Sequence, residues 1–349
     1  MIHGISTPVE PRSSGVLIPW IMVGGGGQLG SEAHRAPRRM LVPLDPQIAA
    51  ILPLLAQAPP LSSGTPESAR AGMRLFTVDL RDPATLPPVR STEDVTYPAH
   101  EGDRAARVYR PDVDGPVPTI LFIHGGGFVI GDIDTYEDQA RLLCKEVGAV
   151  VFSIDYRLAP EDPFPAAHLD SVAALRHVTK TVGSLGGDAT RIAVAGDSAG
   201  GNLSAGVAIT ARDEGLALKA QLLLYPSADF TDTDAHPSRV ENADGYFLTA
   251  DDMLFFRDAY LADPADWRAS ILHHEDLTGV APAVVATAEF DPLRDEGEAY
   301  AAALEKAGAR VIQRRFDGLI HGFFGLGHIS EGCAKANAQI CADLKELLA

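Results

Sequence analysis

Runs of apolar residues alternate with amphipathic stretches along most of this chain. The apolar runs are short and rich in branched residues, which predicts buried strands, and they read VPTILFIHG, AVVFSIDYR, RIAVAG, KAQLLLYPS and PAVVATAE. The stretches between them carry apolar residues at helical spacing, as in FPAAHLDSVAALRHVTKTV and GGNLSAGVAITARDEG. Continuous apolar strands that alternate with such helices are typical of a mostly parallel sheet with helices on both faces. The pattern therefore predicts the α/β class.

Two regions, about 43–85 and 228–277, lack this alternation and predict helices. The first opens with LDPQIAAILPLLAQ and continues with TPESARAGMRLF, where Thr65 stands at a helix N-cap and Pro66 at the first helical position. The second is rich in Phe, Tyr, Leu and Met and contains no strand-like run. Together they would form either a lid over one end of the sheet or one more covering layer. The sequence leaves both interpretations open.

The first 40 residues fit neither pattern, and we expect residues 1–40 to form a poorly ordered extension before a single domain at 41–349. Their apolar run, GVLIPWIMV, is too short to span a bilayer, and no basic residue precedes it between Met1 and Pro11 as a signal peptide would require. The run VGGGGQLG is similar to a dinucleotide-binding fingerprint, but no acidic ribose partner follows it. In this interpretation Met40 is an alternative start.

Charge and cysteine content narrow the class of partner. The chain has 349 residues, with 47 acidic against 29 basic side chains and a formal net charge of −18, which disfavours nucleic acid and anionic membrane surfaces as partners. Its 3 cysteines make no disulfide framework, because Cys333 and Cys341 lie about 12 Å apart on one predicted helix. No cluster of Cys and His residues indicates a metal site. We therefore expect a cytoplasmic protein without a metal or a membrane span.

A candidate nucleophile lies at the end of one predicted strand, in AVAGDSAGGNL. Ser198 has Gly196 and Gly200 two residues away on either side, which is the pattern G-x-S-x-G. In α/β proteins this pattern bends the chain sharply between strand and helix, and it exposes the serine hydroxyl at a helix N-terminus that favours negative charge. A glycine-rich turn with an incidental serine is the structural alternative. A catalytic interpretation therefore needs further residues.

A serine hydroxyl is a weak nucleophile without a base, so we expect a histidine at another strand end. His321 follows the last predicted strand, in DGLIHGFFG, where the glycine-flanked loop could bring its imidazole to Ser198. This base must be neutral to act, so activity should fall as acid protonates it. Four other histidines lie in the suspected lid region or on a predicted helix: His168, His177, His273 and His274.

The base in turn needs a carboxylate that fixes its tautomer. Asp291 begins the loop after PAVVATAE, and Glu289 is the alternative at the same strand end. Asp295 and Glu296 come slightly later and would instead favour the N-terminus of the following helix. The resulting order along the chain is serine, aspartate, histidine, which is the order of α/β-hydrolases and differs from that of chymotrypsin and subtilisin.

A glycine run after an earlier strand supplies a candidate oxyanion hole, in LFIHGGGFVIGD. Consecutive glycines allow backbone N–H groups to converge on one point, and the candidate donors are Gly125, Gly126 and Gly127. A further donor would be Ala199, directly after the candidate nucleophile. The sequence does not decide which glycine amides donate.

Five motifs in order resemble the hormone-sensitive-lipase-like esterases, the bacterial family IV group: HGGGFVIGD, DYRLAPEDPFPAA, GDSAGGNL, DPLRDEGEAY and HGF. The resemblance runs from about residue 43 to the end of the chain. It implies an α/β-hydrolase fold with a helical cap formed by about 43–85 and 228–277, no cofactor, and hydrolysis of short- to medium-chain carboxylic esters. It also implies that Ser198 is the nucleophile, Asp291 the acid and His321 the base.

The family pattern also points to residues around these groups. Glu161, in RLAPED, would support the glycine loop, and His124 and Asp197 flank the two motifs. A buried ion-pair network of Asp155, Arg157 and Glu161 is the structural interpretation, which we favour for those three. The side chains of the second helical region that would line an acyl pocket, or merely pack the cap, are Tyr246, Phe247, Leu248, Leu254, Phe255 and Phe256. We expect the pocket itself to be lined by Phe128, Tyr246, Phe247, Leu248 and Phe255.

Other functions remain as alternatives on the same fold. Plant gibberellin receptors resemble this family and bind small molecules without hydrolysing them, but here serine, aspartate and histidine are all present. An amidase or peptidase would use the same three residues, although no propeller-like repeats precede the hydrolase part. The expected partner is a small-molecule ester, and the resemblance makes a homodimer plausible.

Overall fold

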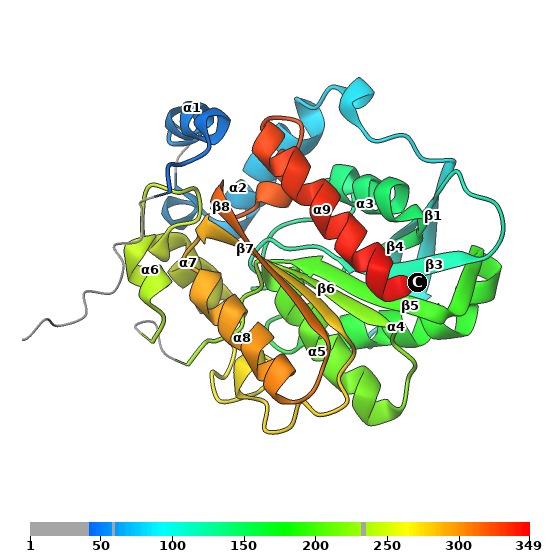
Figure 1. Ribbon diagram of the computed structural model, residues 1–349. Coiled ribbons are helices and arrows are strands. Elements are labelled where there is room, and N and C mark those ends of the chain that lie inside the picture. Colours follow the sequence, from blue (N-terminus) through cyan, green and yellow to red (C-terminus); the bar gives the residue numbers. More distant parts are fainter. Residues whose placement is uncertain (1–41, 58–59, 232–234) are drawn as a thin grey trace, which may run out of the picture. The chain divides into compact units, whose positions relative to one another are not determined.

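The computed structural model describes residues 42–57, 60–231 and 235–349 of the chain (Figure 1). The predicted N-terminal extension, with its apolar run and its glycine run, lies outside these residues. The structure therefore does not test the predicted extension.

A central sheet organises the described residues, and its strand order is β1-β2-β4-β3-β5-β6-β7-β8. The β1–β2 and β2–β4 pairs are antiparallel, whereas every other pair is parallel. The strands are β1 (Ser91–Pro98), β2 (Asp103–Arg110), β3 (Val117–Ile123), β4 (Val150–Ile154), β5 (Gly187–Asp197), β6 (Ala220–Leu224), β7 (Ala283–Phe290) and β8 (Val311–Ile320). The predicted mostly parallel sheet is confirmed.

Helices cover both faces of this sheet (Figure 1). One face is covered by α3 (Glu137–Leu143) and α9 (Glu331–Leu348), and the other by α4 (Ala166–Leu185), α5 (Ala199–Glu214) and α8 (Arg294–Lys306). The remaining α-helices are α1 (Pro46–Leu55), α2 (Pro66–Arg74), α6 (Pro237–Glu241) and α7 (Ala250–Tyr260). Short 3₁₀ or π turns are η1 (Leu61–Ser63), η2 (Leu75–Asp79), η3 (Pro83–Thr85), η4 (Cys144–Gly148), η5 (Ile271–His273) and η6 (Phe323–Leu326).

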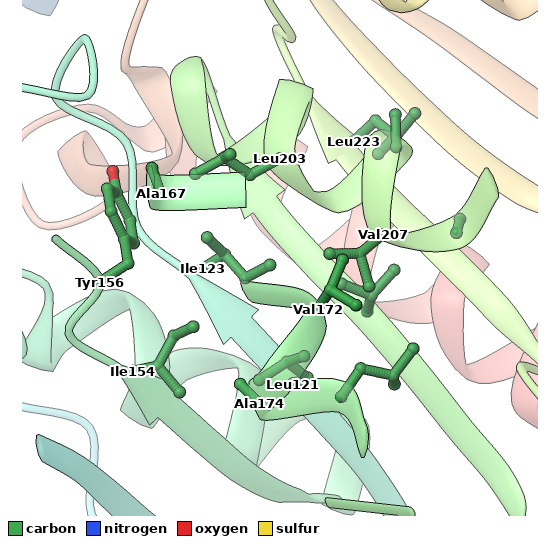
Figure 2. Packing of buried hydrophobic residues seen from close by; sticks show 14 of the residues in the cluster. Leu121, Ile123, Ile154, Tyr156, Ala167, Val172, Ala174, Leu203, Val207 and Leu223 are labelled. Carbon is green, nitrogen blue, oxygen red and sulfur yellow. The ribbon is translucent and has the colours of Figure 1, made fainter. Parts of the chain in front are cut away.

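Strand β3 shows why its sequence is apolar apart from the buried Thr119. Side chains alternate across a strand, so Leu121 and Ile123 point to one face and Ile120 and Phe122 to the other. Leu121 and Ile123 belong to the core beneath α4 and α5 (Figure 2), and Ile120 and Phe122 to the core beneath α3 and α9. All four are fully buried. A strand sandwiched in this way has no solvent face and therefore needs no polar position.

Local signals set the ends of the helices outside the sheet layers. The Thr65 hydroxyl accepts from the Ser68 amide and the Ser68 hydroxyl accepts from the Thr65 amide, which closes a capping box with Pro66 at the first helical position. Asp45 similarly accepts from two amides at the start of α1. The predicted start of the helix at Thr65 is confirmed.

Candidate active site

Ser198 lies at the junction between β5 and α5, in a strained backbone conformation. Its φ is 54° and its ψ is −119°, and its amide donates to the Leu224 carbonyl at 2.8 Å. Glycine is required at both flanking positions because backbone carbonyl oxygens lie close to them. A Cβ at Gly196 would lie 2.3 Å from the Gly200 carbonyl oxygen, and a Cβ at Gly200 would lie 2.1 Å from the Ile123 carbonyl oxygen. The spacing G-x-S-x-G thus lets the turn sit against β3 with the serine at its apex.

Three side chains from distant parts of the sequence meet at this apex. His321 Nε2 lies 3.0 Å from Ser198 Oγ, and His321 Nδ1 lies 2.8 Å from Asp291 Oδ2. Asp291 is fully buried and His321 is 6% exposed. With the ring proton on Nδ1, the imidazole donates to the carboxylate and accepts from the serine hydroxyl. This arrangement can move a proton from serine to histidine while the carboxylate holds the ring.

Strand ends bring these groups together. Asp291 directly follows β7, His321 directly follows β8 and Ser198 directly follows β5. All three residues therefore lie at the carboxyl edge of the sheet. Asp291 Oδ1 also accepts from the Leu293 amide at 2.8 Å. The alternative carboxylate, Glu289, lies within 4.0 Å of Arg294 and within 3.8 Å of Arg315.

The two later carboxylates lie in the first turn of α8, as predicted, and they also bind the segment after β6. Asp295 accepts from the Ser238 amide at 2.7 Å, and Glu296 accepts from the Ala228 amide at 2.7 Å and from Arg239 Nε at 2.8 Å. They therefore hold the 228–241 segment to the start of α8.

One neighbour of His321 was not anticipated from the sequence. The ring of Tyr225, the residue directly after β6, meets the imidazole edge-on with 4.7 Å between centroids. Its position after a strand at the same edge of the sheet was the available signal. The contact limits the orientations open to the imidazole.

The glycine run forms a tight loop beside Ser198, but its three amides are not equivalent. The Gly125 amide donates to Asp197 Oδ1 at 2.8 Å, so it is already engaged. The amides of Gly126, Gly127 and Ala199 make no hydrogen bond to any described residue. The predicted inclusion of Gly125 among the oxyanion donors is therefore not supported, because its N–H is used to anchor the loop.

Asp197 and His124 are buried where the loop meets the nucleophile turn. Burial raises the pKa of the Asp197 carboxyl to about 7, against the opposing influence of His321 and of the hydrogen bond from Gly125. Burial lowers the pKa of His124 to about 4, so its imidazole is neutral near pH 7. His124 Nδ1 lies 2.8 Å from the Gly125 carbonyl oxygen, and its ring stacks on Tyr156 with 4.3 Å between centroids.

Glu161 acts on the loop through an arginine. Arg70, on α2, donates from Nη1 to Glu161 Oε1 at 2.7 Å and from Nε to the Val129 carbonyl at 2.8 Å. Glu161 has a side chain 50% exposed, and its pKa is lowered to about 2 chiefly by the hydrogen bond with Arg70.

The predicted network of Asp155, Arg157 and Glu161 is wrong. Arg157 pairs instead with the buried Asp170, which lies on α4, with Nε 2.9 Å from Oδ2. Asp155 Oδ1 accepts from the Ile133 amide at 2.8 Å. Each of the three groups thus has its own partner.

A cavity of about 1910 Å³ opens at Ser198 and His321 and is lined mainly by apolar side chains of α1, α2, η2 and α7. Of the predicted pocket residues, Phe128, Phe247 and Leu248 line it. Tyr246 stacks on Phe290 instead, and Phe255 packs against the core. Phe256 takes the expected place of Phe255, because its ring faces the glycine loop: a Cβ on Gly127 would lie 2.2 Å from it.

Metal ligation and membrane crossing can be judged for the residues that the structure describes. No group of three or more His, Cys, Asp or Glu side chains is arranged to hold a metal ion in that part of the chain. Within the same residues, no helix has the length and apolar character needed to cross a membrane. The 3 cysteines, all buried, are free thiols.

Comparisons with known proteins agree with this geometry. Residues 120–325 match the family described as the alpha/beta hydrolase fold. The carboxylic ester hydrolase LipN of Mycobacterium tuberculosis is 44% identical over 265 residues, covering 72% of this chain and 69% of that protein. The carboxylesterase NlhH of the same organism is 40% identical over 302 residues, covering 81% of this chain and 89% of that protein.

Solved structures show the same relationship. A hyperthermophilic esterase from the archaeon Pyrobaculum calidifontis superimposes with a TM-score of 0.83 at 41% identity, covering 88% of this chain and 100% of that one. The matched family, the relatives and the superimposed structure indicate the same family. The chain belongs to the hormone-sensitive-lipase-like carboxylesterases of the α/β-hydrolase superfamily.

Proposed function

We propose that this protein is a serine carboxylesterase that hydrolyses short- to medium-chain carboxylic esters through an acyl-enzyme. The observation that carries the proposal is the continuous hydrogen-bonded series from Ser198 Oγ through the His321 imidazole to the buried Asp291 carboxylate. The names of the relatives support the ester as substrate class, since those proteins are a carboxylic ester hydrolase and a carboxylesterase.

The reaction proceeds in two acyl-transfer steps. His321 Nε2 accepts the Ser198 proton as Oγ attacks the ester carbonyl carbon, and the same nitrogen then gives that proton to the departing alcohol. Water attacks the acyl-enzyme with His321 again as base, which releases the carboxylic acid and restores the serine. Asp291 keeps the second ring proton on Nδ1 and stabilises the imidazolium between these steps.

Negative charge on the former carbonyl oxygen is met by backbone amides. We assign Gly126, Gly127 and Ala199 as the donors, because their N–H groups have no partner among the described residues while that of Gly125 is bonded to Asp197. Removing one such donor costs about 3–4 kcal/mol of transition-state stabilisation in other serine hydrolases. Asp197 and His124 position this loop and take no part in proton transfer.

The helical segments at about 43–85 and 228–277 act as a cap in this proposal. Residues of α1, α2 and α7 line the same cavity as Ser198, which supports a role in enclosing the acyl and alcohol groups. A cytoplasmic location also remains part of the proposal. It is supported by the three unpaired thiols, which suit a reducing compartment.

Hydrolysis of p-nitrophenyl esters from acetate to palmitate tests the proposal, with S198A and S204A as matched variants. Ser204 is a fully buried serine further along α5, so its loss controls for removal of a hydroxyl from the same helix. We expect activity on acetate to octanoate esters, a loss of about 10⁵- to 10⁶-fold in kcat for S198A, and near-normal rates for S204A. A wild-type protein inert on every ester, or an S198A variant as active as wild type, would overturn the proposal.

A further inference from the structure

A second cavity, of about 420 Å³, lies along α4. It is bounded by α4, by the turn after β1 and by single residues of α5 and of the segment before η5. None of the residues that line it also lines the cavity at Ser198. The mechanism proposed above makes no use of this cavity.

The lining of this second cavity is basic. Three of its side chains are permanent cations and none of the described lining residues is acidic, although the chain as a whole carries a net charge of −18. The three cations are Arg176, Lys180 and Arg268, and the lining also contains the rings of His100, His168 and His177. Such a group of cations on an acidic chain makes the cavity a candidate anion site.

Carboxylates outside the cavity hold its two arginines in place. Arg176 Nε donates to Glu214 at 2.9 Å, and Arg268 Nη2 donates to Asp266 at 2.6 Å. In both guanidinium groups Nη1 has no partner among the described residues. Two pre-positioned guanidinium groups therefore keep a donor for a ligand.

Lys180 adds an ammonium group without an ion-pair partner among the described residues, and His168 adds a buried imidazole. The Lys180 ammonium makes no ion pair with any described residue, and His168 is 3% exposed with Nδ1 unpartnered beside Gly206. Burial, with Arg268 adding to it and Asp266 opposing it, lowers the pKa of His168 to about 4. Burial and the Lys180 charge also lower the pKa of His177. Burial is the larger cause of both lowered pKa values, and the neighbouring cations add to it.

We propose that this cavity binds a phosphate group, either as inorganic phosphate or as the phosphoryl end of a small organic monoester. A phosphoryl group presents three acceptor oxygens and about −1.5 to −2 charge at pH 7, which suits an ammonium and two guanidinium donors from separate elements. The rest of the lining is largely apolar, including Pro98, Leu169 and Val172, and would accommodate an organic substituent. This inference does not depend on the proposed esterase activity.

Titration calorimetry at constant ionic strength and pH 7 tests the inference with inorganic phosphate, phenyl phosphate and, as a control anion, acetate. The variants are K180Q and R176Q in the cavity, and K306Q as the matched control. Lys306 is likewise exposed near the end of a helix, so its loss changes the net charge equally without touching the site. Each variant is first checked by circular dichroism and thermal unfolding, which show that it is folded like the wild type.

We expect phosphate binding that K180Q and R176Q each weaken at least fivefold and that K306Q leaves unchanged. Tighter binding of phenyl phosphate identifies an organic monoester as the source, and equal binding identifies inorganic phosphate. Ligand should also raise the midpoints of the His168 and His177 ring signals in an NMR titration, because a bound anion offsets the cationic surroundings. The inference is wrong if neither phosphate binds, or if K180Q and K306Q bind alike.

Discussion

The amide of Gly125 donates a 2.8 Å hydrogen bond to the carboxyl group of Asp197, the residue immediately before Ser198. The loop that carries the candidate oxyanion donors is thereby fixed to the turn that carries the candidate nucleophile. A shift of one relative to the other would misplace the amides of Gly126 and Gly127 against the reacting carbon. Asp197 is thus a positioning residue whose protonation is tied to its burial.

Replacing Asp197 by asparagine should stabilise the protein in a pH-dependent way. In the folded chain the pKa of Asp197 is raised to about 7, against about 3.9 when unfolded, so the wild type loses stability as pH rises between these values. Asparagine cannot ionise, yet its amide oxygen can still accept from Gly125. The difference in Tm between D197N and wild type should therefore grow from pH 4 to pH 7 and then level off.

The companion variant D197A removes the acceptor altogether. Its kcat should fall about 10- to 100-fold while D197N stays within a few-fold of wild type at pH 6, because only alanine releases the loop. Thermal unfolding at pH 4.5, 6 and 8 together with ester hydrolysis checks both variants. A Tm difference that does not vary with pH would show that Asp197 is not buried as a proton-bearing group.

The glycine at position 200 should not tolerate a side chain. A Cβ there would lie 2.1 Å from the Ile123 carbonyl oxygen and 2.5 Å from that of His124, and neither backbone atom can move without breaking β3 from β5. G200A should therefore abolish activity and lower Tm by about 4 °C or more, as expected for a cost of roughly 3 kcal/mol or above in a chain of this size.

Gly183 provides the matched comparison for Gly200. It lies inside α4, and a Cβ there would meet nothing within 4 Å. G183A should raise stability by about 0.5–1 kcal/mol, since alanine is the better helix former, and should leave activity unchanged. Chemical denaturation of both variants measures the contrast, and equal effects would refute the packing argument.

Two adjacent phenylalanines on α7 should behave differently. Both pack against the core, but only Phe256 also lines the cavity at Ser198, beside the glycine loop. F256A should shift kcat/KM towards longer acyl chains by several-fold, because it widens the cavity beside the reacting carbonyl. F255A should lower Tm and keep the acyl-length preference of the wild type. A preference that shifts equally in both variants would contradict the assignment.

Arg70 should matter more to catalysis than its ion-pair partner. It donates to the Val129 and Ala159 carbonyls, at 2.8 Å and 2.9 Å, as well as to Glu161. R70A leaves both carbonyls without their donor and frees the end of the glycine loop, so kcat should fall about tenfold. E161Q should cost only a few-fold, because the half-exposed Glu161 is screened by water. The order would be reversed if the carboxylate itself acted on substrate.

Much of the fold was predictable because strands that are buried on both faces of the sheet have continuous apolar sequences. Strand β3 has no polar face, since Leu121 packs under α4 and α5 and Phe122 under α3 and α9. The candidate site was predictable for a related reason: motifs placed Ser198, Asp291 and His321 each directly after a strand, and parallel strands end at one edge.

The sequence does not show in which direction a given side chain or backbone amide points, and the details that it left open depend on this. Neighbouring helical residues point about 100° apart, so the pattern cannot tell whether Phe255 or Phe256 faces the cavity when no strand flanks the helix. Likewise, three consecutive glycines look alike until Asp197 engages one of their amides. Arg157 pairs with Asp170 on the facing helix, and its two nearer carboxylates in sequence, Asp155 and Glu161, point elsewhere.

The bonds from the start of α8 to the segment after β6 bear on how this protein can be rebuilt. Glu296 is fully buried and holds both the Ala228 amide and the Arg239 guanidinium, while Asp295 holds the Ser238 amide. Replacing residues 228–277 by those of another esterase would remove these hydrogen bonds. The buried Glu296 carboxylate would then have no partner. A chimera that redirects specificity must therefore carry the first turn of α8 along with the transplanted segment, as a single cassette.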